Sequence, residues 1–328
     1  MKSRDQMPKG CLRVSFSFAL IIVGFFTMPV GLLFIAIGFF LWALQCIQYR
    51  ASKASQDAQK ETPSTASYSP SQPDPELEKE IKRRREEFLQ KKLRDAQEEL
   101  NSLPRYPITI STEKRKRKTG YEEPTFSNIT AKGKYNEFVV FDTETTGLAP
   151  SKERIIELAA IRFVDGSPTE IFETYINPGK PIPPEATAIN HITDEMVADA
   201  PTISQILPAF EAFVGRSPLV AHNLAFDLKF MYYSGSNLME SPRKYFDTLQ
   251  VAQKMLKKPK YKYDEEFGTW EKDYDSAYDV YDHKLETLAD YYNITCPDQH
   301  RAASDAIVAG KLFLKLIDDK QTYWSSSI

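Results

Sequence analysis

The sequence predicts an α/β fold with a mixed β-sheet flanked by helices, located in the last part of the chain. From Glu137 onward, short apolar runs alternate with segments in which apolar residues recur every three or four positions. Buried strands produce the first pattern and amphipathic helices the second. This region has about 190 residues, which is long enough to bury a core of its own.

The order of these patterns gives the order of the elements. The first strand begins at Glu137, because the apolar run 138–141 follows it directly. Apolar runs predict further strands at 155–164, 169–176, 218–222 and 244–247. Apolar residues at helical spacing predict helices at 202–214, 225–233, 248–257, 284–292 and 301–317.

The rest of the chain has a different composition. Residues 1–136 carry 23 Lys and Arg against 15 Asp and Glu, whereas the remainder carries 19 against 30. A basic front part suits contact with anionic lipid or nucleic acid. We divide the chain into a membrane anchor 1–50, a flexible linker 51–73, a charged helix 74–103, a basic linker 104–134, the α/β domain 135–320 and a tail 321–328.

The segment Val14 to Ile47 contains no charged residue. Its 34 residues would form a helix of ~51 Å, longer than the ~30 Å hydrocarbon core of a bilayer. Pro29 and Gly31 divide it into two apolar halves, which predicts a hairpin in the membrane. Because basic residues flank both ends, we expect both ends and the α/β domain to face the cytoplasm. A single tilted span is the alternative.

Two charged segments follow the anchor. Pairs of opposite charge four residues apart, such as Glu78 with Lys82, predict a long exposed helix after Pro75. Leucine and alanine at coiled-coil spacing allow weak self-association through 77–100. The basic run 114–118 is either a solvated linker or a contact for phosphate or lipid headgroups.

Cysteine and glycine patterns exclude several classes of protein. The three cysteines are far apart and form no C-x-x-C pair, which excludes a disulfide framework and a zinc ribbon. The chain has no P-loop, no dinucleotide fingerprint, no nucleophile elbow and no H-E-x-x-H helix. Kinases, Rossmann dehydrogenases and serine hydrolases are therefore disfavoured.

A pair of carboxylates ends the first strand of the domain. Asp142 and Glu144 are two residues apart, so both side chains lie on one face of the sheet. Carboxylates next to a buried run are costly unless a cation neutralises them. Oxygen ligands favour Mg²⁺ or Mn²⁺.

Three motifs together resemble those of the DEDDh 3′-to-5′ exonucleases of the ribonuclease H-like superfamily. The likeness is greatest to the proofreading ε subunit of bacterial DNA polymerase III and covers residues 135–319. The motifs are Phe141 to Leu148, Ala221 to Asp227 and His300 to Ala306. The resemblance implies a ribonuclease H-like sheet flanked by helices, and His300 assigns the chain to the subclass with histidine.

The resemblance also implies residue roles in a reaction that uses two metal ions. Asp142 would bridge both ions, Glu144 and Asp305 would complete one site, and Asp227 would hold the second ion. His300 would accept a proton from the attacking water, which suits an imidazole with a pKa of ~6.5.

Substrate-contacting residues are expected around these motifs. Members of the family often read His-Gly-Ile-Thr where this chain has Asn190 at the position of the histidine. Glu185 matches an acid that contacts the terminal sugar, while Leu148 and Phe226 either stack on bases or belong to the core. The other substrate-contacting candidates are Thr143 and Asn223. The remaining histidines, His222 and His283, are expected to be structural.

The segment 258–283 is an insertion rich in tyrosine, aspartate and lysine. Aromatic residues among lysines suit a flap that holds a nucleic acid strand. Aromatic residues in a long loop more commonly pin the loop to its domain. We therefore expect this insertion to pack against the domain.

Taken together, the sequence predicts a membrane-tethered, metal-dependent 3′-to-5′ exonuclease. We expect it to release nucleoside 5′-monophosphates from single-stranded 3′ ends, with DNA as the expected substrate. A ribonuclease that trims RNA ends and a proofreading subunit of a polymerase are the alternatives within the family. A catalytically idle membrane protein that binds nucleic acid is the alternative from a different class.

Overall fold

The computed structural model describes residues 75–129, 135–265 and 267–325. The expected membrane anchor 1–50 and flexible linker 51–73 lie outside the described residues. Among the helices of the described part, none has the length and apolar character needed to cross a membrane. The described residues form one unit, which begins at Pro75.

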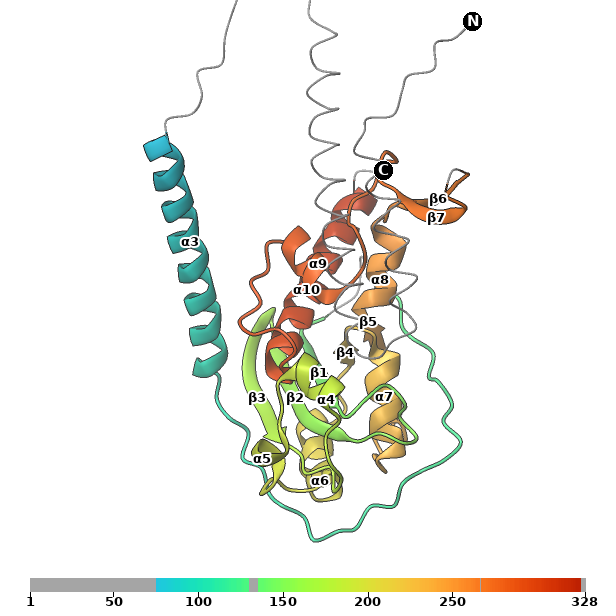
Figure 1. Cartoon of the computed structure of the whole chain (residues 1–328). Helices are drawn as coiled ribbons and strands as arrows, with labels where there is room; N and C mark the ends of the chain where they lie inside the picture. Colours follow the sequence, from blue (N-terminus) through green and yellow to red (C-terminus); the bar gives the residue numbers. More distant parts are fainter. Residues whose placement is uncertain (1–74, 130–134, 266, 326–328) are drawn as a thin grey trace, which may run out of the picture. The chain divides into compact units, whose positions relative to one another are not determined.

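A five-stranded mixed sheet forms the centre of the domain, with the strand order β3-β2-β1-β4-β5 (Figure 1). Strand β1 pairs antiparallel with β2 and parallel with β4. Strand β3 pairs antiparallel with β2, and β5 pairs parallel with β4. The predicted α/β class with a mixed sheet is confirmed. The strands are β1 Glu137–Thr145, β2 Ile155–Val164, β3 Ser167–Tyr175, β4 Leu219–Ala221 and β5 Tyr245–Asp247.

Helices cover both faces of this sheet. Phe138 and Val140 of β1 belong to one core cluster, and Val139 and Phe141 belong to another, as expected for side chains that alternate along a strand. The first cluster contains residues of α8 Thr248–Met255, α9 Leu285–Tyr291 and α10 Ala302–Ser325. The second contains residues of α6 Ile203–Val214 and α7 Leu224–Tyr233.

Helix α10 crosses the sheet at close range. A Cβ atom at Gly310 would lie 2.4 Å from the ring of Phe163, so only glycine fits there. The helix continues to Ser325, beyond the predicted end at Ile317, and includes the first part of the predicted tail. Two short helices, α4 Pro184–Asn190 and α5 Asp194–Val197, enclose a small third cluster with Ile156 of β2.

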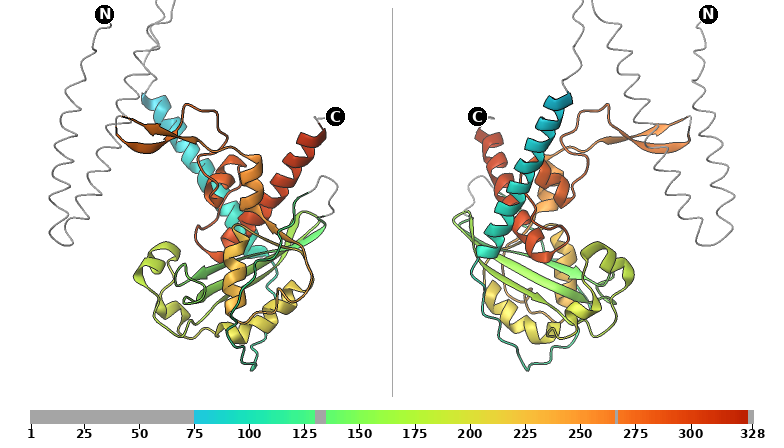
Figure 2. Two further views of the ribbon diagram at one scale, coloured as in Figure 1. Left: turned by 90° about the vertical axis from the view of Figure 1, so that its right-hand side faces the viewer. Right: turned by 60° about the vertical axis from the view of Figure 1, so that its left-hand side comes forward.

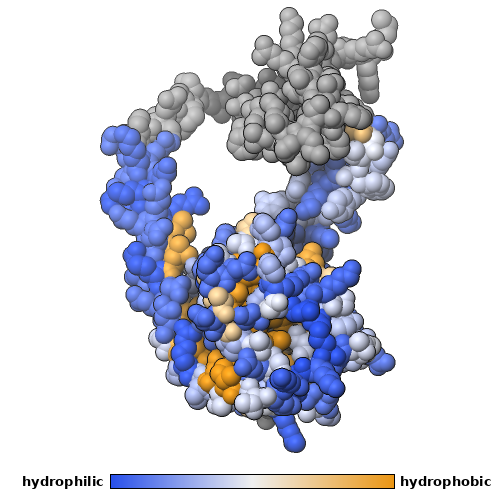
Figure 3. Space-filling view, turned by 60° about the horizontal axis from the view of Figure 1, so that its bottom comes forward, coloured by the Kyte–Doolittle hydropathy of each residue, from blue (hydrophilic) through white to orange (hydrophobic). Residues whose placement is uncertain are grey.

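The charged helix is α3 Pro75–Ser102, and most of its surface is hydrophilic (Figure 3). Ion pairs along it include Arg83 with Glu87 at 2.6 Å. Its last turns pack on the domain, where Ala96 and Leu100 are buried and Glu99 pairs with Lys311 of α10. The coiled-coil positions near residue 100 are therefore occupied by the chain's own domain, and self-association stays a prediction.

Residues 103–129, which we call the strap, differ from the predicted linker because they bind along the domain surface. The Tyr106 N–H donates to the carbonyl oxygen of Ile171 in the edge strand β3 at 2.8 Å, and the Ile171 N–H donates to the Pro104 carbonyl oxygen at 2.9 Å. At the other edge, the Ser127 N–H donates to the Tyr245 carbonyl oxygen at 2.7 Å. Because exposed strand edges are prone to pair with other chains, the strap protects both edges of the sheet.

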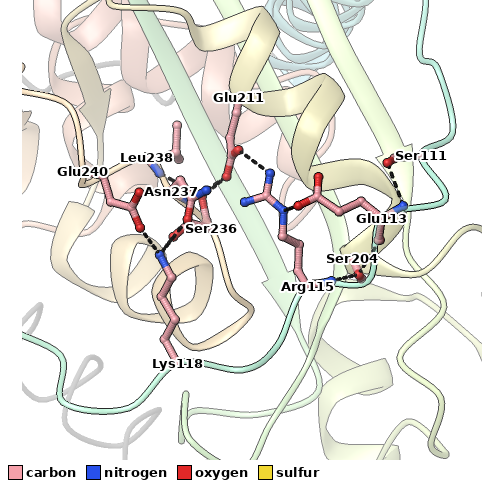
Figure 4. A network of polar contacts seen from close by, with 10 residues as sticks. All are labelled: Ser111, Glu113, Arg115, Lys118, Ser204, Glu211, Ser236, Asn237, Leu238 and Glu240. Carbon is pink, nitrogen blue, oxygen red and sulfur yellow. Dashed lines mark hydrogen bonds and ion pairs between the residues drawn. The ribbon is translucent and has the colours of Figure 1, made fainter.

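Some basic residues of the run 114–118 form ion pairs with acidic residues of the domain (Figure 4). Arg115 pairs with Glu211 of α6 at 3.2 Å, and Lys118 pairs with Glu240 at 2.7 Å. At Gly235 an added Cβ would come within 2.6 Å of the Lys116 carbonyl oxygen, which shows how closely the strap approaches the domain. Two of the cations predicted to meet solvent or phosphate are therefore bound within the chain.

The insertion between α8 and α9 projects as a hairpin of β6 Lys260–Asp264 and β7 Thr269–Asp273 (Figure 2). Both strands are mostly exposed. The expectation that its aromatic residues pack on the domain is wrong, because Phe267 and Trp270 are 69% and 68% exposed.

The strap should contribute to the stability of the domain. The ring of Tyr106 packs 5.1 Å from that of Phe213, so Tyr106→Ala should lower the free energy of unfolding by about 2 kcal/mol. Ile110→Ala is a matched control because Ile110 is a half-exposed residue of the same strap. Urea denaturation measures both. Equal stability of the two variants would contradict a structural role for the strap.

Candidate active site

Three carboxylates from two elements meet beside the central strand. Asp142 and Glu144 alternate with the same period as Phe138 and Val140, so they point to the side of the sheet that α10 covers. Asp305 lies in the first turn of α10. One carboxylate oxygen from each of Asp142, Glu144 and Asp305 lies within 4.8 Å of the others. The sequence-predicted acids are thus brought together.

The electrostatics of this group are unfavourable without a cation. Burial, and then the charges of neighbouring carboxylates, raise the pKa of Asp142 well above its usual range. The same causes raise the pKa of Glu144 to about 8 and that of Asp305 to about 7. Within the described part of the chain, no ion pair joins these three carboxylates to a basic side chain. Their oxygens fit the ligand preference of a divalent metal ion.

Asp227 lies beside this group but outside it. It is buried in the first turn of α7, and its Oδ1 accepts hydrogen bonds from the Thr143 N–H at 3.1 Å and the Thr143 hydroxyl at 2.7 Å. Burial raises the pKa of Asp227 to about 7. Thr143, predicted to contact substrate, is itself buried and orients Asp227 instead.

His300 stands at the entrance to α10. It adopts a left-handed backbone conformation, with φ of 58°, and its backbone lies close enough to the Asp305 carboxylate to lower the pKa of Asp305 somewhat against the larger effect of burial. The two residues line a cavity of about 520 Å³, which Asn223 also lines. An exposed imidazole next to the carboxylate group is placed to exchange protons with water near that group.

A buried ion pair that the sequence analysis missed holds this entrance in position. Glu157 lies opposite Glu144 in the β1/β2 register and is only 1% exposed. The Arg301 guanidinium lies 2.7 Å from the Glu157 carboxylate and 2.7 Å from the Tyr175 hydroxyl, while the Ala302 N–H donates to Glu157 at 2.9 Å. The sequence could have indicated this ion pair, because Glu157 lies inside the apolar run 155–161 and a buried carboxylate needs a partner of opposite charge.

The turn around Asn190 differs from its predicted role. Asn190 is buried, and its Nδ2 donates to the Thr145 carbonyl oxygen at 3.5 Å. Its amide also lies close enough to the Glu144 carboxylate to oppose the upward shift of the pKa of Glu144. Its Oδ1 accepts the Ile192 N–H at 3.1 Å. Asn190 therefore supports a member of the carboxylate group, while Glu185 of the same helix is exposed.

The predicted base-contacting residues have different surroundings. Leu148 follows β1 and is 85% exposed, which leaves it free for a ligand. Phe226 is half-buried, with its ring 4.9 Å from that of Phe230. His222 and His283 are structural: His222 bonds to Thr248 and the His283 carbonyl group, and burial lowers the pKa of His222 to about 4.

Comparison with known proteins agrees with this geometry. Residues 139–313 match the family model RNase_T, described as Exonuclease. A PolC-type DNA polymerase III of Caldanaerobacter subterraneus subsp. tengcongensis is 32% identical over 193 residues, which is 58% of this chain and 12% of that protein. A DNA polymerase III subunit epsilon-like protein of Rhodobacter capsulatus is 36% identical over 189 residues, which is 55% of this chain and 23% of that protein.

The chain thus matches less than a quarter of the length of these relatives. Among solved structures, exonuclease X in complex with 5′ overhanging duplex DNA matches with a TM-score of 0.41 and 23% identity, over 56% of this chain and 92% of that chain. The family model covers more than half of the chain and includes most of β1, all of α7 and the first half of α10. This protein therefore belongs to the exonuclease family, and its α/β domain is a DEDDh-type exonuclease domain related to DNA polymerase III epsilon-like proteins.

Proposed function

We propose that this protein is a metal-dependent 3′-to-5′ exonuclease that releases nucleoside 5′-monophosphates from single-stranded DNA. The observation that carries this proposal is the carboxylate group Asp142, Glu144 and Asp305, whose oxygens approach within 4.8 Å. A phosphodiester is an anion, so bare carboxylates would repel it. The group is useful for hydrolysis only where cations neutralise it.

The chain offers ligands for two such ions. Asp142, Glu144 and Asp305 would hold one Mg²⁺ or Mn²⁺, and Asp142 with Asp227 would hold the other. Bound divalent ions would stabilise the negative charge that develops on the phosphoryl oxygens during hydrolysis. The hydrogen bonds from Thr143 keep the Asp227 carboxylate oriented, and the Asn190 amide lies beside the Glu144 carboxylate.

The remaining residues would handle water and substrate. His300 would accept a proton from the attacking water, and the Glu157 to Arg301 ion pair would fix the backbone beside it. Leu148 and Phe226 would contact the terminal base. Asn223 and Glu185 would contact the terminal nucleotide from α7 and α4 respectively.

Two alternatives keep the same chemistry. The relatives' names connect them with DNA polymerase III, which favours DNA and keeps polymerase proofreading as a second candidate. RNA trimming differs only in how the 2′ position of the sugar is accommodated. An idle protein that only binds nucleic acid is disfavoured, because gathering carboxylates against a polyanion would weaken its binding.

Asp142→Ala should abolish nucleotide release from a labelled single-stranded oligonucleotide, because Asp142 is the proposed ligand of both ions. EDTA should do the same to the wild type. His300→Ala should instead retain measurable activity, reduced by about 10²- to 10⁴-fold as for the loss of a general base. Parallel assays on DNA, RNA and duplex substrates identify the substrate. Full activity of Asp142→Ala would disprove the metal-dependent mechanism.

The carboxylate group should also make stability depend on pH. The pKa of Glu144 is raised from 4.5 to about 8, so the folded chain retains protons that the unfolded chain loses between these values. The free energy of unfolding of the metal-free protein should therefore fall as pH rises through this window. Mg²⁺ or Mn²⁺ should raise the melting temperature, and more so at higher pH.

Differential scanning fluorimetry in EDTA and in Mn²⁺ measures this effect. In Glu144→Gln the carboxylate is replaced by a neutral amide of similar size, so the dependence on pH and metal should be weaker. Glu153 pairs with Lys180 and is not a member of the carboxylate group, so Glu153→Gln is a control with the same chemical change. The same metal response in wild type and Glu144→Gln would contradict metal binding at this group.

We further propose that the uncharged segment 14–47 tethers the exonuclease domain to a membrane on its cytoplasmic side. The support is the absence of charge over 34 residues together with basic residues at both ends. The full chain should sediment with membranes and stay there in high salt, while a chain that begins at residue 75 should not sediment. Release of the full chain by salt alone would indicate peripheral attachment instead.

A further inference from the structure

The β6–β7 hairpin has two chemically different faces. Residues directly opposite each other in an antiparallel pair share a face, and the register pairs Tyr263 with Trp270 and Tyr261 with Lys272. Tyr261, Tyr263 and Trp270 therefore lie on one side, which we call the aromatic face. Lys272, opposite Tyr261, shares this face. The opposite side, which we call the charged face, consists of Lys260, Lys262, Asp264, Thr269, Glu271 and Asp273.

The aromatic face lies in solvent. Trp270, Tyr261 and Tyr263 are 68%, 55% and 51% exposed, and the rings of Tyr263 and Trp270 are 5.5 Å apart. The charged face is internally paired, since Lys262 lies 3.3 Å from Asp273. Adjacent exposed aromatic rings on a projecting element are typical of a binding surface.

The root of the insertion is held firmly. The Lys257 N–H donates to the Asp279 carboxylate at 2.7 Å, and the Val280 N–H donates to the Lys257 carbonyl oxygen at 3.1 Å. His283 is buried, with its Nε2 2.9 Å from the Leu256 carbonyl oxygen. These contacts join the two ends of the insertion and fix the direction in which the hairpin leaves the domain (Figure 2).

The same root borders the catalytic cavity. Lys258 and Lys284, one from each end of the insertion, line the cavity that His300 and Asp305 also line. The acid between them, Asp282, accepts hydrogen bonds from the Lys284 N–H and from the Thr287 hydroxyl. The cavity therefore connects the carboxylate group to two exposed ammonium groups at the base of the hairpin, of which that of Lys284 lies 3.7 Å from the Glu286 carboxylate.

We propose that the aromatic face binds the bases of single-stranded nucleic acid upstream of the 3′-terminal nucleotide, while Lys258 and Lys284 contact its phosphates. Bases stack on tyrosine and tryptophan rings without regard to sequence, and ammonium groups follow the backbone. This inference rests on the proposed exonuclease function and adds to it a second contact region. This second contact region would let the enzyme hold a strand while successive 3′ nucleotides are removed.

The shape and charge of the hairpin favour a single strand over a membrane. A lipid surface that covers the hairpin would also meet the acidic residues of the charged face, whereas a strand contacts one face only. Lys258 and Lys284 line both the base of the hairpin and the catalytic cavity, so a nucleic acid strand could contact the hairpin and the cavity at once. A lipid surface would gain nothing from this connection to the cavity.

The test measures binding and cleavage separately in the full chain. Fluorescence anisotropy in EDTA reports binding of a long single-stranded oligonucleotide without hydrolysis. The double variant Tyr263→Ala/Trp270→Ala should weaken this binding by about 5- to 100-fold for each base stack lost. With Mn²⁺, its KM for the long oligonucleotide should rise, while its kcat and its cleavage of a dinucleotide should stay unchanged, because a dinucleotide is too short to reach the hairpin.

Two controls separate the aromatic face from general surface effects. Glu271→Gln changes the charged face of the same hairpin, and Phe88→Ala removes an aromatic ring that is 58% exposed on α3. Neither should alter binding of the long oligonucleotide. Lys258→Ala and Lys284→Ala should each make binding less dependent on salt, because each removes one proposed phosphate contact.

The outcomes distinguish this inference from the proposed function. A wild type that binds the long oligonucleotide but cleaves nothing would contradict the exonuclease function and leave the binding surface standing. A double variant that binds the long oligonucleotide as well as wild type does would overturn the inference. So would a double variant that loses binding to phosphatidylserine vesicles while its oligonucleotide binding is unchanged, since the aromatic face would then be a lipid contact.

Discussion

The burial of Asp142, Glu144 and Asp305 beside one another, together with their mutual repulsion, is the constraint on which the rest of the domain depends. Each unit of pKa shift corresponds to ~1.4 kcal/mol, so keeping such a group together costs several kcal/mol near neutral pH. The fold tolerates that cost because the carboxylates are attached to rigid elements and cannot move away from one another. β1 is fixed in the centre of the sheet, and Gly310 lets α10 approach it closely.

The contrast between Glu157 and the neighbouring acids separates structural carboxylates from functional ones. Glu157 is as buried as any acid in the domain, yet Arg301 and the Ala302 N–H satisfy it. The three grouped acids have no basic partner among the described residues. The Glu157 to Arg301 pair joins β2 to the start of α10, where His300 and Asp305 lie. Glu157, which has a basic partner, thus helps to hold in place the carboxylates that have none.

The fold class and the pairing of Asp142 with Glu144 were predictable because local patterns determine them, whereas Asp305 was assigned through the resemblance of its motif to those of the exonucleases. The two-residue spacing of Asp142 and Glu144 put both on one face, and the motif around Asp305 gave the helix that meets them. Long-range contacts were not predictable. The approach of Asn190 to Glu144 and the pair of Arg115 with Glu211 join residues far apart in sequence. Composition alone did not show that the insertion stays exposed.

The distribution of cations bears on how an acidic domain can hold a polyanion. Residues 137–328 carry 19 basic against 30 acidic side chains, and the basic run of the strap looked like the compensation. Arg115 and Lys118 instead neutralise Glu211 and Glu240 of the domain itself. With the proposed function, substrate would be attracted over a short range, by cations held in the carboxylate group and by side chains at the rim of the catalytic cavity. Such an arrangement concentrates attraction where hydrolysis takes place, because the surrounding acidic surface disfavours binding elsewhere.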